Sequence, residues 1–242
     1  MRSLVLLPLV STLLFGASQY AVPQIADGGG WQTTITVFNR VNRKVAAQVT
    51  FYAGDGQRLP LSIAGLGVVT SVQLELGPYQ ARAIETLGAG TALAVGWAFV
   101  ESQEDIGGLA VFRQRVAGRP DFEAAVPFTP PEAQVISSFD NMAGCVTGVA
   151  VANTTGGPIA LTFTFRNETG DTVSTMTLTL NPQSHTSFAM TDLWPELAGA
   201  RGSVHVMGRT PVGAPGEFGA LGLRFNATGA FTTLPFFVGI VR

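Results

Sequence analysis

Few side chains in this sequence are suited to chemistry. The two histidines, His185 and His205, both stand in strand-like sequence patterns. A Ser or Cys nucleophile needs a base beside it, and the chain contains no Gly-x-Ser-x-Gly turn. Cys145 stands in an apolar strand pattern with no cationic residue next to it, so we expect a small buried residue. The sequence therefore predicts no catalytic residues and places both histidines at the surface.

Acidic residues gather in one predicted loop that contains Glu101, Glu104 and Asp105. Such oxygen ligands can hold calcium when backbone carbonyl groups join them. Their spacing matches no EF-hand loop. We interpret the loop as a solvated acidic segment, with a calcium site at Glu101–Asp105 as the alternative. No metal ion or other cofactor is predicted.

Charged residues of both signs lie along one predicted hairpin. Arg113 and Arg115 alternate on one strand, and Arg119, Asp121 and Glu123 follow across a turn. Because complementary acids are so close, the favoured interpretation is a cross-strand ladder of ion pairs, each contributing a few tenths of a kcal/mol. The alternative is a contact with an anion or a sugar acid.

Aromatic residues could provide a stacking surface for carbohydrate. Trp97 lies in the middle of a predicted strand, which is typical of core packing. Trp31 follows three glycines, so we expect a more exposed position. Asp27 opens that glycine-rich turn, in which no phosphate-binding pattern is completed. If a ligand site exists, we expect it to include Asp27, Trp31, Arg113, Arg115, Arg119 and Asp121.

Composition and the first residues indicate export. Charged residues make up only 12% of the chain and the net charge is −2, which argues against nucleic-acid binding. Arg2, the apolar stretch Leu4–Phe15 and the small residues Gly16–Ser18 have the pattern of a signal peptide. The apolar stretch is shorter than the ~20 residues that a membrane-spanning helix needs. We therefore expect cleavage before Gln19, no membrane span in the mature protein, and a periplasmic, cell-surface or extracellular location.

An internal repeat divides the rest of the chain. Five blocks recur in the same order with small gaps: 31–39 with 145–153, 45–51 with 159–165, 72–78 with 176–182, 106–113 with 218–225, and 126–128 with 234–236. The alignment also pairs Trp97 with Val206. Each block alternates apolar and polar residues, as half-buried strands do. The sequence predicts an all-β protein of two tandem immunoglobulin-like antiparallel β-sandwich domains, 19–131 and 132–242, produced by internal duplication.

Turn residues separate the expected strands about every eight to twelve positions. The strands are expected at 33–39, 45–52, 69–76, 81–86, 92–101, 108–116, 122–128, 146–153, 159–167, 173–180, 186–190, 202–207, 220–226 and 231–240. One short helical turn is expected at Thr191–Ala198, capped by Thr191 or Asp192. The linker Thr129–Glu132 contains consecutive prolines, so we expect cleavage there to release two separately folded halves.

Several segments resemble a module of secreted bacterial proteins of uncharacterised function. These are Pro23–Thr34, Val95–Trp97, Val111–Gln114 and Gly118–Pro127. The resemblance covers the first copy well and the second copy loosely, because the tryptophans and the Gly118–Phe122 run are missing there. It implies an immunoglobulin-like extracellular module and transfers no catalytic residues.

These observations favour a secreted, non-catalytic β-sandwich protein that acts as a binding, adhesion or surface-structural module. Its expected partners are a glycan or a cell-surface protein, with self-association as a further option. One alternative is a filament subunit whose segment Gln19–Ile25 adds as a strand to a neighbour's sheet. Another alternative is a secreted hydrolase with a site between the domains.

Overall fold

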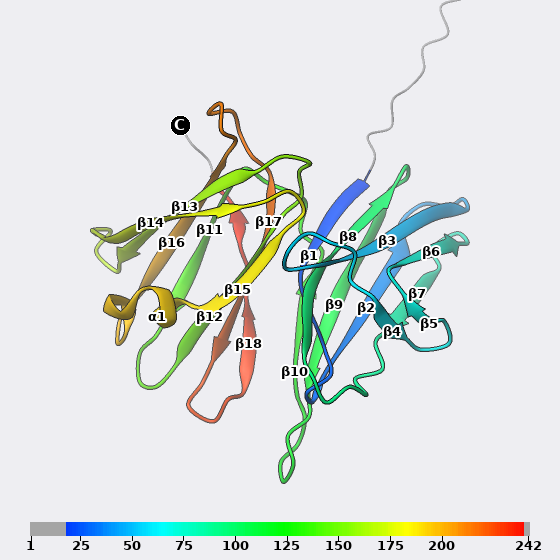
Figure 1. Cartoon of the computed structure of the whole chain (residues 1–242), viewed down its shortest axis with the longest axis horizontal. Helices are drawn as coiled ribbons and strands as arrows, with labels where there is room; N and C mark the ends of the chain where they lie inside the picture. The colour runs from blue at the N-terminus through cyan, green and yellow to red at the C-terminus, as the bar shows by residue number, and fades with distance from the viewer. Residues whose placement is uncertain (1–17, 240–242) are drawn as a thin grey trace, which may run out of the picture.

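A computed structural model of the chain describes residues 18–239 (Figure 1). The predicted signal peptide lies outside the described residues except for Ser18. The described chain is all-β, as predicted, and its sheets are antiparallel. It forms two bodies that lie side by side in Figure 1. We call residues 18–131 the first half and residues 132–239 the second half.

The first half is built from two four-stranded sheets and one short hairpin. One sheet has the order β1 (Ser18–Asp27), β8 (Ala94–Ser102), β3 (Val45–Ala53), β6 (Ser71–Leu76). The other has the order β10 (Phe122–Pro127), β9 (Ile106–Gln114), β2 (Trp31–Asn39), β7 (Ala81–Glu85). The hairpin joins β4 (Leu61–Ile63) and β5 (Gly67–Val69).

The second half also has two sheets. The first contains β14 (Thr172–Leu180), β13 (Ile159–Asn167), β16 (Arg201–Arg209), β11 (Gln134–Asp140) and β19 (Phe237–Val238). The second contains β15 (His185–Ala189), β12 (Val146–Asn153), β17 (Phe218–Phe225) and β18 (Phe231–Leu234). When β11–β18 are matched in turn to β1, β2, β3, β6, β7, β8, β9 and β10, the strand orders of the two halves agree.

The helical turn is present as α1 (Met190–Leu193) and a 3-10 turn, η1 (Pro195–Leu197). The predicted cap is wrong, because α1 follows Ala189 and has no side-chain cap. The prediction lacked β1, its counterpart β11, and the short hairpin of β4 and β5. The segment Gln19–Ile25 of the filament alternative lies in β1 and pairs with β8 of its own sheet.

A buried asparagine ends the matching strands β2 and β12. The Asn39 side-chain amide donates to the carbonyl oxygens of Arg43, Leu76 and Gly77. Its counterpart Asn153 makes the same three kinds of bond, with the carbonyl oxygens of Gly157, Leu180 and Asn181 as acceptors. The same polar contacts thus join strand ends to turns in both halves.

The strand pairings correct one part of the sequence alignment. Val100 lies opposite Val49, and Val206 lies opposite Phe163, the counterpart of Val49. Val206 therefore corresponds to Val100, and the residue that corresponds to Trp97 is Ser203. Consistent with this register, a Cβ on Gly96 would lie 2.1 Å from the Tyr52 oxygen, and one on Gly202 would lie 1.9 Å from the Arg166 oxygen.

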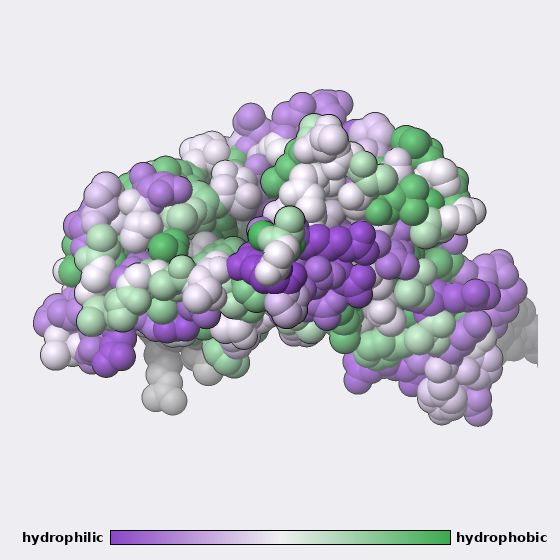
Figure 2. Space-filling model, turned by 90° about the horizontal axis from the view of Figure 1, so that it is seen from below, coloured by the Kyte–Doolittle hydropathy of each residue, from purple (hydrophilic) through white to green (hydrophobic). Residues whose placement is uncertain are grey.

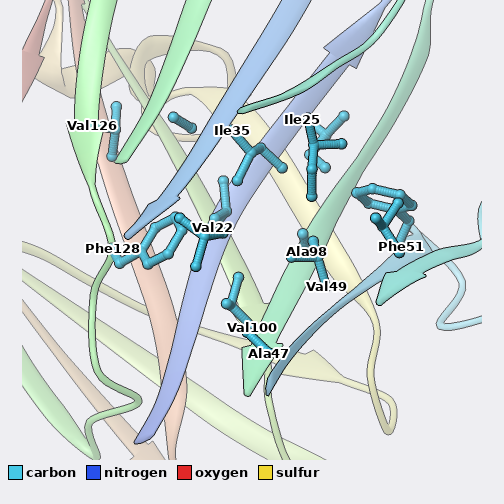
Figure 3. Close-up of a cluster of buried hydrophobic side chains, with 14 of the residues drawn as sticks. Val22, Ile25, Ile35, Ala47, Val49, Phe51, Ala98, Val100, Val126 and Phe128 are labelled. Carbon is cyan, nitrogen blue, oxygen red and sulfur yellow. The ribbon is translucent and has the colours of Figure 1, made fainter. Parts of the chain in front are cut away.

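Each half has its own hydrophobic core between its two sheets. In the first half, Val49, Phe51 and Val100 face Ile35 and Val126 across the core (Figure 3). In the second half the core is rich in aromatic residues, with Phe139, Phe163, Phe165 and Trp194 in contact. The first core does not stop at the linker, because Ala150, Leu221 and Phe231 of the second half belong to it.

The two central strands of the sheet β15-β12-β17-β18, β12 and β17, are covered on both faces. Along β12, Val149 and Val151 point into the core of the second half, whereas Ala150 and Ala152 contact residues of the first half. Strands that are covered on both sides show nearly continuous apolar sequences, as this strand does. The sheet thus serves two cores at once.

Trp97 is fully buried, as predicted, but the second half contributes to its burial. It packs with Ala21 and with Ala152 of the second half, and it stacks on Tyr52 at a centroid distance of 4.9 Å. The linker is also part of this contact. The Thr129 main chain pairs with Ala21, and the Glu132 main chain pairs with Phe218. The two halves are therefore joined by a packed interface as well as by the chain.

Candidate binding site between the two halves

A pocket of about 290 Å³ opens between the two halves. Its residues come from β1, β2, β8, β9 and the 86–93 loop of the first half, and from β12, β15 and β17 of the second half. They are Gln24, Ala26, Trp31, Leu93, Val95, Phe112, Gly148, Val149, Ala150, Ser187, Phe188, Ala189, Leu221, Leu223 and Phe225. The outward face of the sheet β15-β12-β17 thus forms one wall, and the first half forms the other.

Residue size along the strands explains why space remains there. Gly148 and Ala150 are small, and they leave room beside the larger Leu221 and Leu223 of the neighbouring strand. On the opposite wall, Trp31 is half-buried and its ring lies 5.3 Å from that of Phe231. Leu93 and Ser187 are exposed lining residues and mark the opening to solvent.

The described residues that line the pocket include no charged side chain. The polar members are Gln24 and Ser187. The Gln24 side-chain oxygen already lies 3.0 Å from Nε2 of His185. Strand β12 is paired on both sides, with β15 and with β17, so its main-chain groups are engaged along this wall. The pocket therefore offers mainly hydrocarbon and aromatic contacts.

Of the six residues predicted for a ligand site, Trp31 lines this pocket. Asp27 does not line the pocket but bonds to a loop that does. Its Oδ1 accepts a hydrogen bond of 2.8 Å from the Gly88 amide. That bond ties the 86–93 loop to the end of β1. Since Leu93 belongs to the pocket wall, Asp27 helps to position the wall without lining the pocket.

The hairpin arginines form the ion pairs of the favoured ladder interpretation. Arg113 lies opposite Glu123 in the β9–β10 pairing, and its Nε is 2.7 Å from Oε1 of that glutamate. Asp121 lies between the two arginines, 3.9 Å from Arg113 and 3.8 Å from Arg115. Seen from below in Figure 2, hydrophilic residues gather in the middle of the molecule, where this hairpin projects.

Arg119 connects the hairpin to the second half. Its Nη1 donates a hydrogen bond of 2.6 Å to the Thr228 carbonyl oxygen, and its guanidinium group lies 3.7 Å above the Phe122 ring. Arg113, Arg115, Arg119 and Asp121 are thus placed together by the structure, but beside the pocket and not in its wall.

His185 lies in the interface, so the prediction of a surface position is wrong for this residue. It is 6% exposed, and its main-chain amide bonds to the Gly54 oxygen of the first half. Burial lowers the pKa of His185 to about 4, against a smaller opposing effect of a hydrogen bond with the Pro23 backbone. His205 is partly buried, and burial followed by the charge of Arg166 lowers its pKa.

The acidic loop is paired with arginines. Arg40 lies 3.2 Å from Asp105, and Arg43 pairs with Glu104. Across residues 18–239, no group of three or more His, Cys, Asp or Glu side chains is placed to hold a metal ion. Cys145 is buried, as predicted.

Sequence reasoning missed most of the pocket wall, above all Leu221, Leu223 and Phe225. A usable signal was present in β12 and β17, whose apolar residues do not alternate strictly with polar ones. Such runs indicate that both faces of a strand are covered.

Within the part of the chain that the structure describes, no helix has the length and apolar character needed to cross a membrane. Comparison with known protein families, curated proteins and solved structures finds no match to this chain.

Proposed function

We propose that this chain is a secreted, non-catalytic binding protein whose ligand occupies the pocket between the two halves. The observation that carries the proposal is the pocket itself, an apolar space that both halves line and that Trp31 borders. Ligand sites are commonly found at domain interfaces, with mostly apolar walls and few polar groups. An immunoglobulin-like duplication is part of the proposal, and the matching strand orders and asparagine contacts support it.

The hydrolase alternative needs a base at this inter-half site. His185 is the histidine near the pocket, and its Nε2 already contacts Gln24. With a pKa of about 4, His185 is neutral at pH 7 but only weakly basic. General bases work best when their pKa lies near the operating pH. These properties favour binding over turnover.

The filament alternative requires Gln19–Ile25 to add as a strand to a neighbour's sheet, whereas this segment pairs with β8 of its own sheet. Filament growth by repeated docking of one half on another is a separate possibility. The first half presents Trp97, Phe99 and Tyr52 toward the second half. The corresponding positions of the second half are Ser203, His205 and Arg166. Because aromatic residues are replaced by polar ones, the same docking contact is not suited to repetition by a further copy.

Tryptophan fluorescence provides a direct test. Trp97 and Trp194 are 0% and 2% exposed, so a ligand-dependent change in emission reports mainly on Trp31. We would screen the mature protein against neutral and acidic glycans, apolar small molecules and cell-surface fractions, and measure retention and product release. The expected result is retention without product, weakened in Trp31→Ala but not in Tyr79→Ala, which removes an exposed aromatic ring elsewhere.

Two outcomes would contradict the proposal. Release of a product would favour the hydrolase. Binding that survives Trp31→Ala but is lost in Arg113→Ala would move the site from the pocket to the charged hairpin.

A further inference from the structure

We infer that the pocket takes a single unbranched hydrocarbon chain of roughly ten carbons, whose polar end stays in water. This inference rests on the proposed binding function and assigns the chemical class of its ligand. It follows from the charge, the main-chain pairing, the volume and the opening of the pocket.

The lining excludes a ligand whose charged group enters the pocket. None of the described lining residues carries a charge, and the Gln24 amide is already in contact with His185. A charged or strongly polar group placed inside would lose its hydration without gaining a partner, which disfavours its entry. The part of the ligand that enters the pocket is therefore apolar.

The main chain around the pocket also disfavours an extended peptide. Peptides that add to a sheet need free N–H and C=O groups at a strand edge. Strands β12 and β17 have partners on both sides, and the main-chain groups of Ala26 bond to the Thr33 hydroxyl, whereas β15 forms the edge of its sheet. Along the wall formed by β12 and β17, binding must then come from side-chain contacts, which a hydrocarbon chain satisfies fully.

Volume and opening define the size and shape of the occupant. The space of about 290 Å³ is about twice that of an apolar cavity of ~150 Å³ that accommodates one benzene ring. The opening beside Leu93 and Ser187 allows a polar end group to remain in solvent. A closed cavity would accept only a pure hydrocarbon, whereas this one suits an amphiphile with one chain.

The test is a chain-length series of straight-chain primary alcohols, from six to fourteen carbons, followed by Trp31 emission and by calorimetry. Each buried methylene should tighten the apparent Kd about fourfold. The gain should stop near ten carbons, when the pocket is full. Decanoate and a decanoyl lysophosphatidylcholine, titrated below their micelle concentrations, distinguish a free acid from a lipid-borne chain. Binding of either one supports the inference.

A pair of matched variants locates the effect. Ser187→Phe places a ring at the mouth of the pocket and should weaken decanol binding at least tenfold. Ala83→Phe is the control, because Ala83 is the corresponding exposed position on β7 of the first half, away from the pocket. The chain-length series on the unmodified protein remains decisive if Ser187→Phe fails to fold.

The possible failures can be told apart. Affinity that is independent of chain length would overturn the inference. A Trp31 response to glycans without any response to alkyl chains would also overturn it, while the proposed binding function would stand. If no compound class in the screen changes Trp31 emission and none is retained, both proposals fail.

Discussion

The indole Nε1 of Trp97, in the first half, donates a hydrogen bond of 2.8 Å to the carbonyl oxygen of Gln183, in the second half. This bond lies in the interface, where Trp97 has no exposed surface. A buried indole with its N–H satisfied across two bodies fixes how they sit against each other.

Two substitutions of Trp97 should destabilise the protein to different degrees. Trp97→Phe keeps a ring but leaves the Gln183 oxygen without its donor, so we expect a loss of about 1–2 kcal/mol in the free energy of unfolding. Trp97→Ala also opens a cavity and should cost about 3–5 kcal/mol. Chemical denaturation measures both values. Equal losses for the two variants would show that the ring packing contributes little.

The contact between β1 and β17 is sensitive to a single methyl group. A Cβ on Gly219 would lie 2.4 Å from Cβ of Ala21. Gly219→Ala should therefore push β17 away from β1 and destabilise the protein by about 1–3 kcal/mol. Gly157→Ala is the control, since its Cβ would meet nothing within 4 Å. Comparable stability in both variants would mean that β17 and β1 can separate enough to admit the methyl group at little cost.

Cleaving the linker should not separate the halves. With a protease site placed between Pro130 and Pro131, we expect the cut chain to elute as one species in size-exclusion chromatography, because the interface buries Trp97 and Leu221. The sequence alone predicted two separately folded halves. Elution as two smaller species with unchanged spectra would support that simpler interpretation and would show that the interface is weak.

His185 should make stability depend on pH. Its pKa falls from 6.5 in the unfolded chain to about 4 in the folded protein, so the unfolded state binds the proton more readily between these values. The free energy of unfolding should fall as the pH drops from about 6.5 to about 4, by up to ~3 kcal/mol, and this contribution should then level off.

His185→Gln isolates this effect from the carboxyl groups that titrate in the same range. The variant should lose less stability between pH 7 and pH 4.5 than the unmodified protein does. Parallel stability curves for the two proteins would show that His185 is protonated in the folded state without penalty.

The buried asparagines should matter more than exposed ones. Asn153→Ala removes three hydrogen bonds at a buried strand end, those to the carbonyl oxygens of Gly157, Leu180 and Asn181, so we expect a loss of about 2–4 kcal/mol. Asn39→Ala should give a similar loss. Asn167→Ala removes turn contacts that are exposed to solvent and should cost about 1 kcal/mol. Thermal unfolding of the three variants ranks them, and a large loss for Asn167→Ala alone would contradict this account.

Local alternation was sufficient to predict most strands. The expected range 159–167 is the range observed for β13, and 146–153 is that of β12. The strand β1 was missed because it begins at the predicted cleavage site and contains Pro23. The alignment of Trp97 with Val206 was wrong because sequence similarity is weak there, and only the strand pairing fixes the register.

The candidate site was less predictable. Trp31 could be selected because a bulky ring after three glycines is unusual in a core. Leu223 and Phe225 could not be assigned to a pocket, because a sequence shows that a strand face is apolar but not what covers it. The hairpin arginines were included in the predicted site because of their charge, and the structure places them in ion pairs beside the pocket.

The sheet with two covered faces has a consequence for folding during synthesis, because the first half cannot be fully covered until this sheet has been made. While the ribosome is still making residues 146–225, the Trp97, Tyr52 and Ala21 surface of the nascent first half has nothing to cover it. An apolar surface of this kind attracts other nascent chains and holdase chaperones until its own partner emerges. If the chain is exported, as we propose, this delayed covering favours translocation before folding is complete. The last step of maturation would then be the docking of the two halves, which also creates the pocket.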